Sequence, residues 1–406
     1  MMTIDPPANE LDCAANPHAS TGHRLPHPAP GAASKVASVA SEFADSVDLE
    51  ARFPIESVAA LREQRLLSAA IPREMGGESA TLREIAKVCR MLGSSCASTA
   101  MIYAMHHAQI YCLVKHMKDD VWFRTFFQDM AREQWLLASA TSEDTIGGDV
   151  RSSVCAVMAN ASGEFTLSKR ATTISYGAYA DAILATARRN VDAAAADQVL
   201  VMLKREDLSL QPTSVWNTLG MRGTCSGGFM LEGRGHVQQV FQTPFSEIAD
   251  RTILAVSHVL WSSVWLGIAT DAVRRGQKYF RKQVRLESGA ATQSSMRLTN
   301  ALGMLRTMEA TIDAATQCHE QEMDAESQAL LSRSALRMND LKIRMSNMAL
   351  DIVREVMQLC GMAAYKNDTP FSLGRHLRDL HSAPIMINND RLAGNMAVLM
   401  MAERAI

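Results

Sequence analysis

The residues that could perform chemistry in this 406-residue sequence are cysteines and histidines, and few of them are grouped. The eight cysteines form no C-x-x-C pair, so their spacing indicates neither a zinc site nor a disulfide framework, and we expect reduced thiols. His18, His23 and His27 have no partner residues at ligand spacing, so we expect no metal site. His258 and His381 are candidates for proton transfer, because an unperturbed imidazole titrates near neutral pH.

The composition is that of an ordinary soluble protein. The formal net charge is −2, which gives no reason to expect a nucleic acid or an anionic membrane as partner. Aromatic residues make up only 5% and there are 25 methionines, which favours packed helices over sheets. The first residues lack the pattern of a signal peptide, and the apolar stretch 256–269 is too short to cross a bilayer. We therefore expect a cytoplasmic protein.

The elements that must position any site fall into three sections after an extension. Residues 1–34 are rich in Pro, Ala, Ser and His without periodicity, and we predict a disordered extension. Residues 35–132 show apolar residues at helical spacing and predict an N-terminal helical domain. Residues 133–240 predict a barrel-like β-domain, and residues 241–406 predict a C-terminal four-helix bundle. The fold class is thus mainly α with a central β-domain.

The predicted β-domain consists of short apolar segments separated by Gly, Asn, Asp or Ser. We predict strands at 135–140, 154–159, 164–169, 182–187, 199–203, 228–231 and 237–240.

Five sequence blocks resemble those of acyl-CoA dehydrogenases, and they occur in the same order. Residues 142–149 (SEDTIGGD) resemble the family's T-E-P-G-A-G-S-D loop, and residues 169–177 (KRATTISYG) continue the likeness. Residues 216–226 (WNTLGMRGTCS) match the family's W-x-x-x-G-M-R-x-T-x-S element. Residues 358–361 (QLCG) and 375–379 (RHLRD) are similar to Q-x-x-G-G-x-G-Y and R-x-x-R-D. The resemblance covers about residues 36–406 and implies an FAD-dependent oxidoreductase.

The resemblance also implies which residues bind the flavin. Ser142 would meet the pyrimidine side of the ring, and the backbone of the loop at Gly148 would offer free N–H groups. Ser175 matches the threonine that approaches the flavin N5 atom. This fold has no G-x-G-x-x-G loop, and the chain contains none.

A second group of residues would reach the flavin from a neighbouring subunit of a homotetramer or homodimer. Gln358 and Gly361 would face the dinucleotide part of FAD, although Met362 stands where the family has a second glycine. Arg281 or Arg285 would pair with the pyrophosphate as a planar donor. We interpret Arg378 and Asp379 of the R-x-x-R-D block as a structural ion pair.

The sequence lacks the glutamate that performs the family's usual chemistry. Dehydrogenation of an acyl thioester requires a carboxylate that removes the α-proton while hydride passes to the flavin. In the family this Glu follows the R-D element by eight residues, a position that Ile387 occupies here. Some members place the Glu on the first helix after the β-domain, and that position falls at Ser257, next to His258.

The candidates for a replacement base are therefore His258, which we favour, and His381. Glu143 lies in the flavin loop and is interpreted as structural. Thr173 stands where many dehydrogenases have a tryptophan that packs on the flavin, so this edge of the ring would be more open.

Three functions remain open from the sequence. The first is oxidation of an acyl thioester, bound to CoA or a carrier protein, at the α,β carbons. This is the function we predict, and an electron-transfer protein or a flavin reductase would be its partner. The alternative is a monooxygenase on the same fold that uses reduced flavin and O₂, and such members lack the Glu because oxygenation requires no α-proton abstraction. The third is a non-enzymatic flavin-binding protein, which the near-complete set of FAD motifs argues against.

Overall fold

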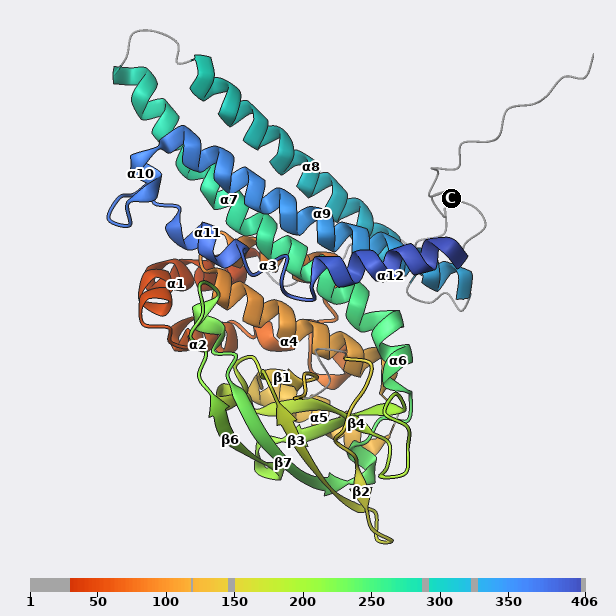
Figure 1. Cartoon of the computed structure of the whole chain (residues 1–406). Coiled ribbons are helices and arrows are strands. Elements are labelled where there is room, and N and C mark those ends of the chain that lie inside the picture. The colour runs from red at the N-terminus through yellow and green to blue at the C-terminus, as the bar shows by residue number, and fades with distance from the viewer. Residues whose placement is uncertain (1–29, 118–119, 145–149, 287–291, 323–327, 403–406) are drawn as a thin grey trace, which may run out of the picture.

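The computed structural model describes residues 30–117, 120–144, 150–286, 292–322 and 328–402. A smaller β-domain lies at one end of the molecule, against two groups of helices (Figure 1). The N-terminal helices lie between the strands and the long C-terminal helices. The predicted fold class, mainly α with a central β-domain, is confirmed.

The N-terminal section is helical throughout, and its helices begin earlier than the sequence predicted. Helix α1 starts at Pro30, so residues 30–34 are helical and not part of an extension, while residues 1–29 lie outside the described residues. Helix α3 begins with a capping box in which Thr81 and Glu84 bond reciprocally. The five helices are α1 (Pro30–Leu49), α2 (Ile55–Glu63), α3 (Leu82–Gly93), α4 (Ala97–His116) and α5 (Val121–Glu133).

The β-domain is built from two small sheets. One has the strand order β1-β4-β5 and the other β2-β3-β7-β6. Strands β4 and β5 are buried on both faces, which explains their continuous apolar sequences. The strands are β1 (Leu137–Ala140), β2 (Met158–Ala159), β3 (Glu164–Ala171), β4 (Ala182–Arg188), β5 (Gln198–Lys204), β6 (Leu208–Ser214) and β7 (Gly228–His236).

Two strand predictions were wrong. The segment at 237–240 is not a separate strand, because β7 continues to His236 and residues Val237–Gln239 form a 3₁₀ turn. Strand β6 was missed, because it is an exposed edge strand that contains Pro212 and shows little apolar alternation. The ladder between β6 and β7 is irregular beside that proline.

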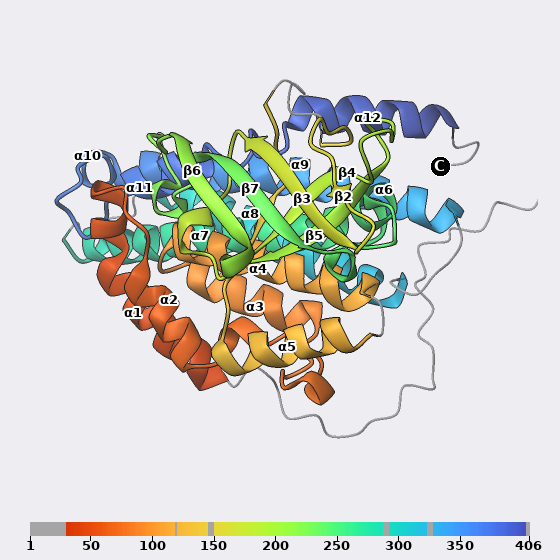
Figure 2. The same ribbon diagram turned by 90° about the horizontal axis from the view of Figure 1, so that it is seen from below.

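The C-terminal section is dominated by three long helices, α7 (Leu254–Leu286), α8 (Thr292–Glu322) and α9 (Gln328–Cys360). Helices α7 and α9 run parallel: His258 contacts Met338 near their starts, and Gly276 approaches Val356 near their ends. The shorter helices are α6 (Phe245–Ile248), α10 (Met362–Tyr365), α11 (Gly374–Leu380) and α12 (Asn389–Ala402). Viewed from the β-domain, the strands lie over these helices (Figure 2).

Helix α7 is the central helix of the core. Gly267 crosses Gly93 of α3 so closely that a Cβ atom on Gly267 would lie 2.3 Å from the Arg90 carbonyl oxygen. The helical stretch Phe245–Val284 is long and apolar enough to span a membrane, but 89% of its most apolar window is buried inside the protein. Such burial is typical of the core helix of a soluble protein. The division into domains at 132/133 and 240/241 stays a prediction.

Candidate active site

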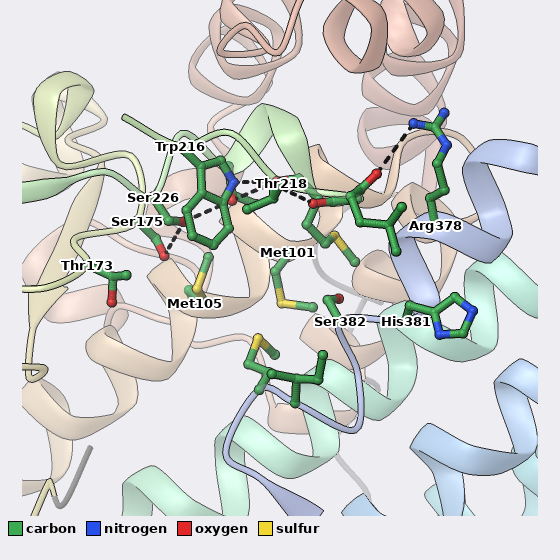
Figure 3. Close-up of a pocket in the computed structure, with 16 residues that line it drawn as sticks. Met101, Met105, Thr173, Ser175, Trp216, Thr218, Ser226, Arg378, His381 and Ser382 are labelled. Carbon is green, nitrogen blue, oxygen red and sulfur yellow. Dashed lines mark hydrogen bonds between the residues drawn. The ribbon is translucent and has the colours of Figure 1, made fainter. Parts of the chain in front are cut away.

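A cavity of about 390 Å³ lies where the β-domain meets α4 and the segment that follows α11. Figure 3 shows hydroxyl-bearing residues of the β-domain on one side and His381, Ser382 and Arg378 on the other, with two methionines of α4 between them. The lining residues are Met101, Met105, Thr173, Ser175, Trp216, Thr218, Leu219, Gly220, Met221, Thr224, Ser226, Arg378, His381, Ser382, Ile385 and Met386.

The β-domain contributes a row of linked hydroxyl groups to the cavity. The Ser226 hydroxyl donates to Ser175 Oγ at 2.9 Å and lies 2.9 Å from Thr224 Oγ1. Thr224 Oγ1 is also 2.9 Å from the carbonyl oxygen of Met221. All three residues line the cavity; Ser226 and Thr224 are buried, whereas Ser175 is half-buried. The row therefore runs along the cavity wall from a buried end at Thr224 to a half-buried end at Ser175.

Ser142 is not a lining residue of the cavity, but its side chain holds the lining residue Thr173 in place. The Ser142 hydroxyl donates to the Thr173 carbonyl oxygen at 2.8 Å and accepts from the Thr173 N–H at 3.0 Å. Two segments that the sequence singled out separately are thus held together. Thr173 itself lines the cavity, as its predicted place beside the flavin requires.

Glu143 anchors the same segment through a buried ion pair. Its carboxylate accepts from the Lys169 ammonium at 3.0 Å, from the Ser153 hydroxyl at 2.7 Å and from the Cys155 N–H at 2.7 Å. Burial acts to raise the pKa of the Glu143 carboxyl, but the Ser153 hydrogen bond and the charge of Lys169 outweigh it and hold the pKa below its ordinary value. These contacts support the interpretation of Glu143 as structural.

The R-x-x-R-D block is arranged differently from our interpretation. Among the described residues, Arg378 forms its ion pair with Asp48 of α1 and not with Asp379. Asp379 instead accepts from the backbone N–H of Met221 at 2.7 Å, and burial raises the pKa of its carboxyl to about 6. The two side chains are adjacent on α11, so they project in different directions, one to α1 and one to the cavity wall at Met221.

The remaining lining is apolar. Met101 and Met221 are buried, and Met105, Trp216, Ile385 and Met386 complete the apolar surface. Arg378 and His381 are the only ionisable residues among those that line the cavity. No Asp or Glu belongs to this described lining, so the cavity holds no candidate carboxylate base.

Ile387, which replaces the family's glutamate, stands just past the cavity wall. Its backbone is left-handed, with φ of 49°, which is uncommon for a β-branched residue. The buried Lys342 ammonium donates to the Ile387 carbonyl oxygen at 2.6 Å and to Asn389 Oδ1 at 2.7 Å. Burial lowers the pKa of Lys342 to about 8. The lysine thus holds the segment that carries Ile385 and Met386.

His258 is separated from this chemistry. It lies within α7, is fully buried, and donates through Nδ1 to the Met338 carbonyl oxygen of α9 at 3.0 Å. Burial lowers its pKa to about 3, and it is not among the described residues that line the cavity. His381, the second candidate, does line the cavity, and the structure records no hydrogen bond of its ring to any described residue.

The structure separates the predicted flavin-binding residues into two places. Ser175 lines the cavity and Ser142 bonds to the lining residue Thr173, whereas Arg281, Gln358 and Gly361 are exposed near the paired ends of α7 and α9. Gly361 has φ of 55°, and a Cβ atom there would meet no other atom within 4 Å. Gly148 lies outside the described residues.

Several lining residues had not been singled out from the sequence. Met101 and Met105 are one helical turn apart on α4, and their pattern indicated only core packing. Thr224 and Ser226 are the T-x-S of the matched W-x-x-x-G-M-R-x-T-x-S element, so the motif did contain the signal.

Comparison with known proteins identifies the family. The N-terminal domain model of acyl-CoA dehydrogenases matches residues 32–159, and a C-terminal domain model of the same family matches residues 259–389. A curated relative, the probable FMNH2-dependent monooxygenase SfnC of Pseudomonas putida, is 25% identical over 382 residues, which cover 88% of this chain and 90% of the relative.

Solved structures share the fold. FMN-bound TdsC from Paenibacillus sp. A11-2 matches with a TM-score of 0.83 and 16% identity, covering 93% of this chain and 98% of TdsC. The methanesulfinate monooxygenase MsuC from Pseudomonas fluorescens matches with a TM-score of 0.77 and 17% identity, covering 90% of this chain and 95% of MsuC. The two family models together span more than half of the sequence, in the order the motifs predicted. The chain is therefore a member of the acyl-CoA dehydrogenase family of flavin-dependent oxidoreductases.

Proposed function

We propose that the protein is a flavin-dependent monooxygenase that uses reduced FMN and O₂ to oxygenate a small, mainly apolar substrate. The observation that carries the proposal is the cavity itself, whose described lining contains no carboxylate. Acyl-thioester dehydrogenation needs an anionic base at the α-carbon, and neither Ile387 nor the buried His258 can supply it. SfnC, TdsC and MsuC are each described as monooxygenases, which supports the same conclusion.

The residues of the cavity fit a flavin ring. Thr173 and Ser175 offer hydroxyl groups for its polar edge, and Met101, Met105 and Trp216 offer apolar surface for its faces. When bound, the reduced flavin supplies the electrons that activate O₂. The apolar walls exclude water from the reacting atoms.

His381 is the proposed proton-handling group. Its imidazole lines the cavity, and none of the described residues hydrogen-bonds its ring, so both nitrogens are available to a substrate or to water. We assign it the role of holding or moving a proton at the substrate. The base role that the sequence suggested for His258 is not part of this proposal.

We propose FMN as the flavin, in place of the FAD predicted from the sequence motifs. TdsC is described as FMN-bound and SfnC as FMNH2-dependent. Gln358, Gly361 and Arg281 are exposed, so they remain available to a neighbouring copy, and we propose a homotetramer or homodimer. A separate cytoplasmic reductase would supply the reduced flavin.

The substrate class follows from the cavity and the relatives together. TdsC is described as a dibenzothiophene monooxygenase and MsuC as a methanesulfinate monooxygenase, and both named substrates contain sulfur. Met221, Leu219 and Ile385 give this cavity an apolar surface that suits a neutral compound. We therefore propose a small apolar substrate with an oxidisable sulfur or nitrogen atom.

The test supplies the protein with reduced FMN and ¹⁸O₂ in the presence of aromatic and aliphatic sulfides, sulfinates and amines. One labelled oxygen atom in a product supports the proposal. Dehydrogenation of an acyl thioester, the reaction after which the matched family is named, is the second candidate. It is tested by adding acyl-CoAs to the flavin-loaded protein without oxygen, where bleaching of the flavin would overturn the monooxygenase proposal.

A further inference from the structure

In the linked hydroxyl row the structure records Ser226 as donor to Ser175 and leaves the donor open between Thr224 and Ser226; because hydroxyl hydrogens rotate, both bonds can also run the other way. Thr224, Ser226 and Ser175 follow one another at 2.9 Å, and each hydroxyl has a single hydrogen. Thr224 Oγ1 is 2.9 Å from both Ser226 Oγ and the Met221 carbonyl oxygen, so its one hydrogen must choose between the two. The acceptor to which Thr224 donates therefore decides which way the other hydrogen bonds of the row run.

In the first arrangement the hydrogens point toward the cavity. Thr224 donates to Ser226, Ser226 donates to Ser175, and the Ser175 hydrogen is free to donate to whatever occupies the cavity. The Met221 carbonyl oxygen is not left unpaired, because Trp216 Nε1 donates to it at 3.1 Å. Every buried polar group in the row therefore keeps a partner.

In the second arrangement all three hydrogens point into the protein. Thr224 donates to the Met221 carbonyl oxygen and Ser226 donates to Thr224. Rotation of the Ser175 hydroxyl then reverses the recorded bond, so that Ser175 donates to Ser226 across the same 2.9 Å. The Ser175 oxygen then faces the cavity as an acceptor only. The two arrangements differ by rotation of hydroxyl groups, so no proton leaves its oxygen and no bond is made or broken.

A flavin needs both arrangements in turn. The N5 atom of oxidised flavin is a hydrogen-bond acceptor, whereas the same atom of reduced flavin carries a hydrogen and is a donor. We propose that Thr224 and Ser226 are positioning residues that let Ser175 act as donor to oxidised flavin and as acceptor from reduced flavin. This inference rests on the proposed function, because it requires that flavin occupy the cavity beside Ser175.

The burial of Thr224 and Ser226 makes the effect measurable. Both side chains are at most 5% exposed, so water does not readily replace a lost partner. In Ser226→Ala, Ser175 can still donate to oxidised flavin. When it accepts from reduced flavin, however, its own hydrogen loses the Ser226 acceptor, and with flavin filling the cavity beside Ser175 this unpaired donor is the more costly defect.

The experiment measures the dissociation constants of oxidised and of reduced FMN, the latter without oxygen, for wild type and variants. We expect Ser226→Ala to raise the ratio of the reduced to the oxidised constant about fivefold to tenfold. Thr224→Val should change the ratio in the same direction. Ser226→Thr keeps the hydroxyl and should restore the wild-type ratio.

Thr218→Val is the matched control. Thr218 also lines the cavity, but its hydroxyl donates to the Gly220 carbonyl oxygen at 3.0 Å and is outside the row. The ratio of the reduced to the oxidised FMN dissociation constant in Thr218→Val should therefore equal that of wild type. A ratio in Ser226→Ala within twofold of wild type, or an equal weakening of both constants, overturns the inference while leaving the proposed function intact. Failure of wild type to bind either form of FMN overturns the proposed function as well.

Discussion

The ammonium group of Lys342 lies 2.6 Å from the carbonyl oxygen of Ile387, the residue at the position of the family's catalytic glutamate. A buried cation on α9 thus holds the backbone at the position where the family has its carboxylate. The left-handed conformation of Ile387 is unfavourable for a β-branched side chain and persists because this contact and that of Asn389 hold it. The same segment presents Ile385 and Met386 to the cavity.

Replacement of this lysine should loosen the cavity wall. Lys342→Met leaves the Ile387 and Asn389 oxygens without their donor, and we expect the free energy of unfolding to fall by about 1–3 kcal/mol. Amide hydrogen exchange should accelerate in residues 383–389, and KM for the substrate should rise. Lys366→Met removes an exposed positive charge and serves as control. Unchanged exchange in that segment would contradict the role given to Lys342.

His258 is expected to support stability and not turnover. His258→Ala removes a fully buried ring and its hydrogen bond to Met338, so we expect the free energy of unfolding to fall by about 2–4 kcal/mol. His258→Asn retains a donor near Nδ1 and should lose less. The measurement is kcat per bound flavin in the folded variants, which should stay near the wild-type value. Loss of turnover in folded, flavin-loaded His258→Asn would restore this residue as a candidate base.

The protein should lose stability as the pH falls from about 6.5 to about 4. Burial lowers the pKa of His106, His116 and His319 to about 4 and that of His258 to about 3. In this pH window the unfolded chain binds protons that the folded chain cannot. Each such histidine therefore lowers the free energy of unfolding by about 1.4 kcal/mol for every pH unit of acidification. The carboxyl of Asp379 acts in the opposite direction, because its folded pKa is raised to about 6, but it is one group against six histidines, since burial also lowers the pKa of His107 and His376.

Urea unfolding at a series of pH values measures this dependence. A variant that removes one histidine, His106→Gln, should show a shallower slope of unfolding free energy against pH than wild type. A stability that is flat between pH 4 and 6.5, or that increases on acidification, would contradict the assignment of neutral buried imidazoles.

Removal of only one partner of the buried Glu143–Lys169 ion pair should lower the free energy of unfolding substantially. Lys169→Met leaves the Glu143 carboxylate buried without its counter-charge, and we expect a loss of about 3–5 kcal/mol in the free energy of unfolding. The double variant Glu143→Gln/Lys169→Met removes both charges and should recover much of that loss. If the double variant is no more stable than Lys169→Met, the ion pair is not the reason for the loss.

Much of the fold was predictable because hydrophobic periodicity depends on local sequence. The apolar runs of β4 and β5 and the stripes of α8 and α9 gave the correct element types. Strand β6 was missed because an exposed edge strand lacks such a pattern. The helical residues 30–34 were missed because their composition resembles that of an extension.

The candidate site was predictable only where a motif fixed a residue. A motif block led to Ser175 and Thr173, and His381 was a candidate base two residues past another block; all three line the cavity. The pairing of Arg378 with Asp48 joins residues 330 positions apart, and nothing in local spacing indicates it. His258 was chosen by its place in the sequence, whereas its burial between α7 and α9 depends on tertiary packing.

The central claim is that this protein activates O₂ with reduced FMN and holds the oxygen for a substrate. The most direct measurement mixes the protein loaded with reduced FMN with O₂, without substrate, and follows O₂ consumption and H₂O₂ release together. We expect O₂ to be consumed promptly and H₂O₂ to appear only after a lag that free reduced FMN does not show. Release of H₂O₂ in step with O₂ consumption would contradict the claim.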